Sequence, residues 1–220
     1  MAAGPSSPTP DAPASDEPSP RGGGRLTLWG IGILVLAVSL FGGHGGTSDG
    51  SARAGGTSAA TADPRQTGPS LPRATPTRLT IPKIGVDAPF TTLALGADGQ
   101  LQPPPADDTN LVGWYAGGVT PGESGTSIIA GHVDTKTSPA VFASLDDLAP
   151  GDRFSVLRAD GREAVFVVDS ADTFAKDDFP SKRVYADTNR PEARLITCAG
   201  DYDHSAKDYT ENLVVFAHLV

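Results

Sequence analysis

The stretch DRFSVLRADGREAVFVVDSA, residues 152–171, indicates the fold class of this 220-residue chain. Its two halves, 152–157 and 163–171, alternate apolar and polar residues, as strands do when one face is buried. The joint between them contains Asp160-Gly161, a dipeptide that favours a tight turn between antiparallel strands. The segment is therefore predicted to be a β-hairpin.

The rest of the C-terminal two thirds of the chain repeats this pattern. Further strands, separated by Gly, Pro and Asp turns, are expected at 78–82, 126–131, 193–198 and 212–219. Only 138–148 has helical spacing, with Val141, Leu145 and Leu148 on one side and Ser138-Pro139 suited to its start. We expect an all-β fold, a small and mostly antiparallel barrel or sandwich.

An apolar stretch, LTLWGIGILVLAVSLFGG at residues 26–43, precedes this region. Its 18 residues carry no charge and would span about 27 Å as a helix, close to the roughly 30 Å hydrocarbon core of a bilayer. It predicts a transmembrane anchor, with a cleaved signal peptide and a buried core helix as the alternatives. Arg21 and Arg25 flank it closely, whereas the next basic residue is Arg53. The positive-inside rule then places the N-terminus in the cytoplasm and the rest of this single-pass chain outside the cell.

Composition divides the remaining chain. Residues 1–25 are rich in Pro, Ser, Ala and Gly and predict a disordered cytoplasmic tail, and residues 44–77, similar in composition, predict a flexible tether. The folded domain is expected at 78–220, with 12 Lys and Arg against 21 Asp and Glu, a net charge of −9. This charge argues against nucleic acid or an anionic lipid surface as partner and suits an amine-bearing one.

Cys198 is the only cysteine of the chain, so it cannot form an internal disulfide. It is either a buried, inert side chain or a nucleophile kept for chemistry. Cys198 ends the predicted strand 193–198, and His132 follows the predicted strand 126–131. Two strand ends can meet in a barrel, so His132 is the best candidate to work with the thiol, against a purely structural histidine.

The sequences AGHVDTKTSPAVFASLDDLAPGD and LITC, with RLTIPKIGVDAPF and GVTPGESGTSIIAGH, resemble those of sortases, specifically the actinobacterial class F type. The resemblance covers most of residues 78–220. It implies an eight-stranded β-barrel with one or two short helices, preceded by a transmembrane helix. It also implies that His132 and Cys198 are the catalytic residues. We expect no cofactor, and no metal site, because the spacing of the acidic, His and Cys residues shows no recognisable metal pattern.

The activity that this resemblance implies is that of a membrane-anchored cysteine transpeptidase. Cys198 would attack the Thr carbonyl of an LPxTG-like sorting signal on a surface protein and form a thioester, while His132 protonates the leaving amine. An amine of a peptidoglycan precursor or a pilin would then resolve the thioester. The alternatives are a degenerate sortase fold that only binds peptides and a hydrolase that releases the surface protein to water.

The sequence departs from the sortase pattern at one place. Sortases carry an arginine on the strand after the cysteine, and the matching position here is Asn212, with Thr210 two residues earlier where some relatives have it. Lys207 is the only Lys or Arg after Cys198, and Arg183, Arg190 and Arg194 precede it. Candidates for a third role are Asn212, Lys207 and Asp134, the last as a partner that orients His132. Thr197 and Trp114 are candidates for substrate binding.

Overall fold

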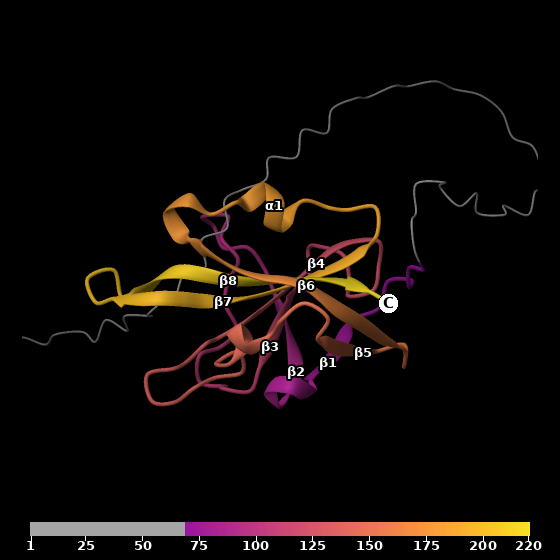
Figure 1. The fold of residues 1–220 in the computed structure, drawn as a ribbon, viewed down its shortest axis with the longest axis horizontal. Helices are drawn as coiled ribbons and strands as arrows, with labels where there is room; N and C mark the ends of the chain where they lie inside the picture. Colours follow the sequence, from indigo (N-terminus) through magenta and orange to yellow (C-terminus); the bar gives the residue numbers. More distant parts are fainter. Residues whose placement is uncertain (1–68) are drawn as a thin grey trace, which may run out of the picture. The chain divides into compact units, whose positions relative to one another are not determined.

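The computed structural model describes residues 69–220, so the predicted tail, the anchor and the tether up to residue 68 lie outside the described residues. Residues 69–220 form one closed barrel in the order β1-β2-β3-β4-β7-β8-β6-β5. The strands are β1 (Pro76–Ile81), β2 (Val86–Leu93), β3 (Val112–Tyr115), β4 (Gly125–Gly131), β5 (Arg153–Arg158), β6 (Glu163–Ala175), β7 (Pro191–Asp203) and β8 (Asp208–Leu219). The expected all-β, eight-stranded barrel is confirmed (Figure 1).

Most neighbouring strands are antiparallel, as predicted. The hairpin of residues 152–171 forms β5 and β6, and Gly161 turns the chain between them at a φ of 78°, a conformation that suits glycine. Two pairs are parallel instead, β2 with β3 and β4 with β7. Parallel neighbours cannot be joined by a tight turn. The β4–β7 pair therefore brings together segments about 65 residues apart in the chain.

Two strands were missed from the sequence. β2 contains Pro89, which weakens a strand pattern, and β3 is four residues long and includes Gly113. The small helical elements were also missed: α1 (Ser181–Tyr185) and the 3-10 turns η1 (Pro82–Ile84) and η3 (Lys176–Asp178).

The helix predicted over residues 138–148 was wrong. Only the 3-10 turn η2 (Leu145–Asp147) forms there. The amides of Ala140 and Phe142 donate to the carbonyls of Val133 and His132, so this segment is tied to the end of β4 and cannot start a helix of its own. Val141, Leu145 and Leu148 are nevertheless buried on one side, which is what their spacing reported.

The packed part of the chain begins upstream of the expected boundary at residue 78. The Leu71 amide donates to the Gly122 carbonyl at 2.8 Å, and the buried Arg158 guanidinium donates to the Pro72 carbonyl. Arg73 lies over the Trp114 ring and pairs with Glu123. Residues 71–77 are therefore part of the folded domain and not of the predicted tether.

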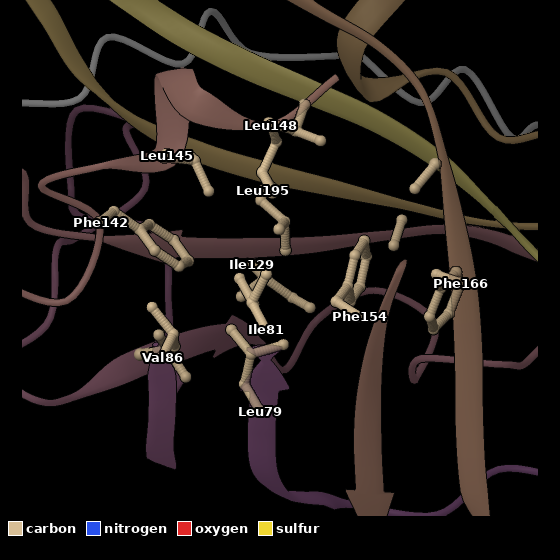
Figure 2. Close-up of a cluster of buried hydrophobic side chains, with 14 of the residues drawn as sticks. Leu79, Ile81, Val86, Ile129, Phe142, Leu145, Leu148, Phe154, Phe166 and Leu195 are labelled. Carbon is tan, nitrogen blue, oxygen red and sulfur yellow. The ribbon is translucent and has the colours of Figure 1, made fainter. Parts of the chain in front are cut away.

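The barrel interior is filled by one apolar cluster from all sides (Figure 2). Ile129 of β4 and Leu195 of β7 lie at its centre in Figure 2, and both are fully buried. The rings of Phe154 and Phe166, on neighbouring strands β5 and β6, stack with their centroids 5.1 Å apart. This packing fixes β4 and β7 side by side and so supports the ends of both strands.

Within residues 69–220, no helix has the length and apolar character needed to cross a membrane.

Replacing Ile129 with Ala should lower the free energy of unfolding of the full-length protein by about 2–5 kcal/mol, because the cavity left at the barrel centre cannot collapse. Urea unfolding followed by circular dichroism measures this change. Leu157→Ala is the matched control, since the Leu157 side chain is 43% exposed and its truncation should cost less than about 0.5 kcal/mol. Equal effects of the two substitutions would contradict the described core.

Candidate active site

The parallel register of β4 and β7 places His132 beside Cys198. Ala130 pairs with Ile196 at the end of the described register, and His132, just past β4, and Cys198 each follow this pair by two residues. The Thr197 hydroxyl donates to the Gly131 carbonyl at 2.9 Å, which holds the two chains together at this point. The two predicted residues therefore follow neighbouring strand positions that are held together, and their action as a catalytic pair stays a prediction.

Residues on the next two strands, β8 and β6, lie level with Cys198. Cys198 pairs with Asn212 of β8, and Asn212 pairs with Phe174 of β6. Directly paired residues project from the same face of a sheet. Alternate residues of β7 and β8, such as Leu195 and Leu213, belong to the interior cluster. Cys198 and Asn212 therefore lie on the outer face of the barrel.

Thr197 has the opposite orientation to its neighbour. It is 1% exposed, and its hydroxyl is bound to Gly131 across the β4–β7 pair. The expected place in a substrate groove is therefore wrong for its side chain, because side chains alternate between faces along a strand and the outer face is taken by Cys198. Thr197 fixes the two strands that carry the histidine and the thiol.

A second apolar cluster covers the outer face next to the thiol. It includes Ile128 and Ala130 of β4 and Ile196 of β7. Two connections pack on these residues: the segment between β2 and β3 through Leu101, and the segment between β6 and β7 through Phe179. In Figure 1 the segment that carries α1 runs along one side of β6 and β8. The outer face is therefore an apolar strip that leads along β4 and β7 to Cys198.

The Cys198 thiol is 6% exposed. The pKa of the thiol is raised to about 11, mainly because a thiolate loses hydration inside the protein, and the carboxylates of Asp208 and Asp134 contribute to this rise. The Lys176 ammonium acts in the opposite direction. The resting thiol is thus protonated at neutral pH.

Lys176 is the cation that the tertiary structure places at the thiol. It begins η3, directly after β6, and its Nζ lies 3.8 Å from Cys198 Sγ. The same Nζ pairs with Asp208 Oδ1 at 2.7 Å, and the two side chains are only 12% and 23% exposed. This residue was not predicted from the sequence, since it stands 22 positions before the cysteine and belongs to no motif. It could be found only by knowing that β6 pairs with β8, and the positions of the strands in the sequence do not say which strands pair.

The His132 ring is also buried, and its Nε2 lies 2.8 Å from the Pro104 carbonyl oxygen. A carbonyl only accepts, so Nε2 carries a proton and donates it. Pro104 belongs to the segment between β2 and β3 that also covers the apolar strip. The partner of the imidazole is therefore a backbone carbonyl.

Asp134 was expected to orient His132, and the described contacts give it another partner. Its Oδ2 accepts a hydrogen bond from the Tyr209 hydroxyl at 2.5 Å. Burial together with this carboxylate raises the pKa of Tyr209 to about 12. Asp134 thus joins the end of β4 to β8 and places a negative charge near the thiol.

Asn212 is fully buried, and neither its Nδ2 nor its Oδ1 has a hydrogen-bond partner. A buried amide without partners is costly, by about 1–3 kcal/mol for each lost group. Because Asn212 pairs with Cys198, this unused donor and acceptor lie next to the thiol. Such a group indicates a polar ligand at the site.

The other residues that the sequence offered lie elsewhere. Lys207 is exposed in the turn between β7 and β8, with a φ of 57°. Trp114 is buried under Arg73 and donates from its indole nitrogen to the Val119 carbonyl at 2.9 Å, so it supports the fold. Three arginines pair with carboxylates of their own, Arg183 with Asp172 and both Arg190 and Arg194 with Glu192.

Comparisons with known proteins identify the family of this chain. The family model described as "Sortase domain" matches residues 79–220. The chain therefore belongs to the sortase family, a family of cysteine transpeptidases. A comparison with curated protein sequences finds no match.

Solved sortase structures share the fold. A complex of Streptococcus agalactiae sortase C1 with MTSET is 22% identical, with a TM-score of 0.51 over 69% of this chain and 72% of that one. A lid mutant of Corynebacterium diphtheriae sortase A is 22% identical, with a TM-score of 0.51 over 68% and 72%. These two structures show the shared fold, the family model shows the family, and the class F subtype stays a prediction.

The pH dependence of thiol alkylation tests the described environment of Cys198. The rate with iodoacetamide should rise about tenfold per pH unit from pH 7 to pH 10 without levelling off, because the thiolate fraction keeps growing until the pH exceeds a pKa of about 11. Mass spectrometry of the intact protein measures the rate, and Cys198→Ser gives the blank, since the chain has no other cysteine. A plateau reached near pH 8.5 would contradict the buried thiol.

Proposed function

We propose that this protein cleaves an LPxTG-like sorting signal through a thioester on Cys198 and transfers the acyl group to an amine. The observation that supports the proposal is the parallel β4–β7 pair, because His132 and Cys198 each follow its last pair, Ala130 and Ile196, by two residues, at the end of an apolar strip. Membership of the sortase family supports the same chemistry.

In the first step, Cys198 Sγ forms a bond to the carbonyl carbon of the substrate Thr, and the carbonyl π electrons move onto its oxygen. Because the resting thiol is protonated, attack requires that its proton be taken up, and His132 lies on the adjacent strand. The oxyanion then collapses, the carbon–nitrogen bond breaks, and the leaving amine takes the proton from the imidazolium.

In the second step, a neutral amine attacks the thioester carbonyl, an amide forms and the thiolate of Cys198 leaves. The amine's proton passes to the neutral imidazole of His132 and from there back to the thiolate, which restores the resting thiol. Thioesters favour amines over water as attacking groups more than oxygen esters do, which suits a transferase. The acceptor would be an amine of a peptidoglycan precursor or of a pilin lysine. The excess of acidic residues in the folded domain would favour an approaching ammonium-bearing acceptor.

The proposed setting is the outer surface of the cell membrane. The uncharged stretch 26–43 and the flanking Arg21 and Arg25 support a single-pass anchor with the N-terminus in the cytoplasm. The client would then be a surface protein that carries the sorting signal.

The full-length protein, incubated with an LPxTG-type peptide, should show an acyl adduct on Cys198 by intact mass, and the adduct should decay faster when an amine is added. Cys198→Ala should abolish the adduct and all cleavage. His132→Ala should lower turnover by about 10²–10⁴-fold, because the proton transfers lose their carrier. Chromatography of the peptide products measures turnover.

The outcomes separate the alternatives. An adduct that decays at one rate with and without amine would show a hydrolase. Peptide binding without any adduct, across several motif variants, would show a binding module and overturn the proposal.

A further inference from the structure

The geometry points to Lys176 as a further catalytic residue. We propose that its ammonium stabilises the negative charge that develops on Cys198 Sγ and on the oxyanion formed beside it. This inference rests on the proposed function, because the oxyanion arises only during acyl transfer. Lys176, in the connection after β6, would then supply the positive charge that an arginine on β8 supplies in the sortase pattern.

The position of Lys176 relative to the thiol is the first argument for this role. Phe174, Asn212 and Cys198 form one row across β6, β8 and β7 on the outer face. Lys176 follows Phe174 by two residues, where β6 ends, and its side chain reaches across β8 to the thiol, at 3.8 Å between Nζ and Sγ. His132 approaches from β4 on the other side of β7. The thiol thus lies between an imidazole and an ammonium.

The ion pair between Lys176 and Asp208 is the second argument. Asp208 begins β8, and its Oδ1 holds the ammonium at 2.7 Å in a place where both side chains are mostly buried. A flexible lysine chain is thereby held near Sγ instead of extending into solvent. Charges interact more strongly where water is excluded, so a cation fixed here acts on the thiol more than a surface cation would.

The chemistry of the reaction supplies the third argument. When Sγ bonds to the carbonyl carbon, the oxyanion forms on the atom next to that carbon, close to where Sγ now lies. An ammonium already in contact with Sγ needs only a small movement to donate to that oxygen. The unpartnered Nδ2 of Asn212, which pairs with Cys198, is the second donor available at this place. Prepositioned donors of this kind are what acyl transfer requires.

Turnover of an LPxTG-type peptide by the full-length protein tests the role. Lys176→Met should lower kcat/KM by about 10²–10³-fold, the usual cost of one oxyanion donor, and Lys176→Arg should recover part of the loss. Lys83→Met is the matched control, because Lys83 also pairs with an aspartate, Asp152, at 2.7 Å but lies in η1 and more exposed. It should leave turnover unchanged. Urea unfolding of each variant confirms the fold.

A second measurement needs no substrate. Lys176→Met should slow alkylation of Cys198 by iodoacetamide at pH 8 about tenfold, since the thiolate loses its nearest cation, while Lys83→Met should not change the rate. The charged and titratable groups around the thiol are Lys176, Asp208, Asp134 and Tyr209, with His132 on the β4 side, and only Lys176 changes in this comparison.

The outcomes distinguish the two proposals. If the unaltered protein forms the acyl adduct and Lys176→Met has the same turnover and alkylation rate, the role of Lys176 is overturned and the proposed function stands. If Lys207→Met loses more turnover than Lys176→Met, the cation of the site is Lys207 and the inference is wrong. If the unaltered protein forms no adduct, the proposed function fails, and an unchanged alkylation rate in Lys176→Met would then overturn the electrostatic role as well.

Discussion

The parallel pairing of β4 with β7 is the constraint on which the site depends. It joins two segments of the chain whose sequence separation is about 65 residues, and its register ends at Ala130 and Ile196, two residues before His132 and Cys198. Fully buried Ile129 and Leu195 hold the pair from inside the barrel, and the Thr197 hydroxyl ties its end to Gly131. A shift of one residue would turn Cys198 into the core, because side chains alternate between the two faces.

Because side chains alternate, β7 has one set of residues that packs in the core and another set that lies at the site. Residues such as Ala193 and Leu195 fill the barrel, whereas Ile196 and Cys198 lie on the outer face under the two connections. One strand thus carries both the core and the nucleophile. The chain after the thiol leaves the regular ladder at Gly200, whose φ of 78° accompanies the register shift between Ala199 and Tyr202. The site therefore lies where a rigid ladder gives way to an irregular hairpin.

Burial and the neighbouring charges together set the ionisation of the Cys198 thiol. Loss of hydration and two nearby carboxylates, Asp208 and Asp134, disfavour the thiolate, and the Lys176 ammonium favours it. The balance leaves a protonated resting thiol. Such a group is protected from chance reaction until a substrate excludes water and a neighbouring base takes its proton. The same carboxylates hold the site together, since Asp208 binds Lys176 and Asp134 binds the Tyr209 hydroxyl.

The sequence by itself determined the all-β class, the hairpin of β5 and β6, and the two residues at the centre of the proposed chemistry. Period-two alternation and turn residues are local signals, so they survive without tertiary information. The helix predicted from the same kind of local pattern over residues 138–148 does not form. Its spacing correctly indicates one buried side, but its backbone amides donate to the carbonyls of His132 and Val133. A pattern of burial does not define which backbone partners are used.

Tertiary structure alone decided the surroundings of the thiol. From the sequence, the cations considered for the site were Lys207, which follows Cys198, and Arg183, Arg190 and Arg194, which precede it. The ammonium at the site comes from Lys176, which only the pairing of β6 with β8 brings within 3.8 Å of Sγ. Thr197, beside Cys198 in sequence, faces the opposite way. Distance along the chain is set by covalent order, whereas electrostatic contact in a barrel is set by which strands pair and in what register.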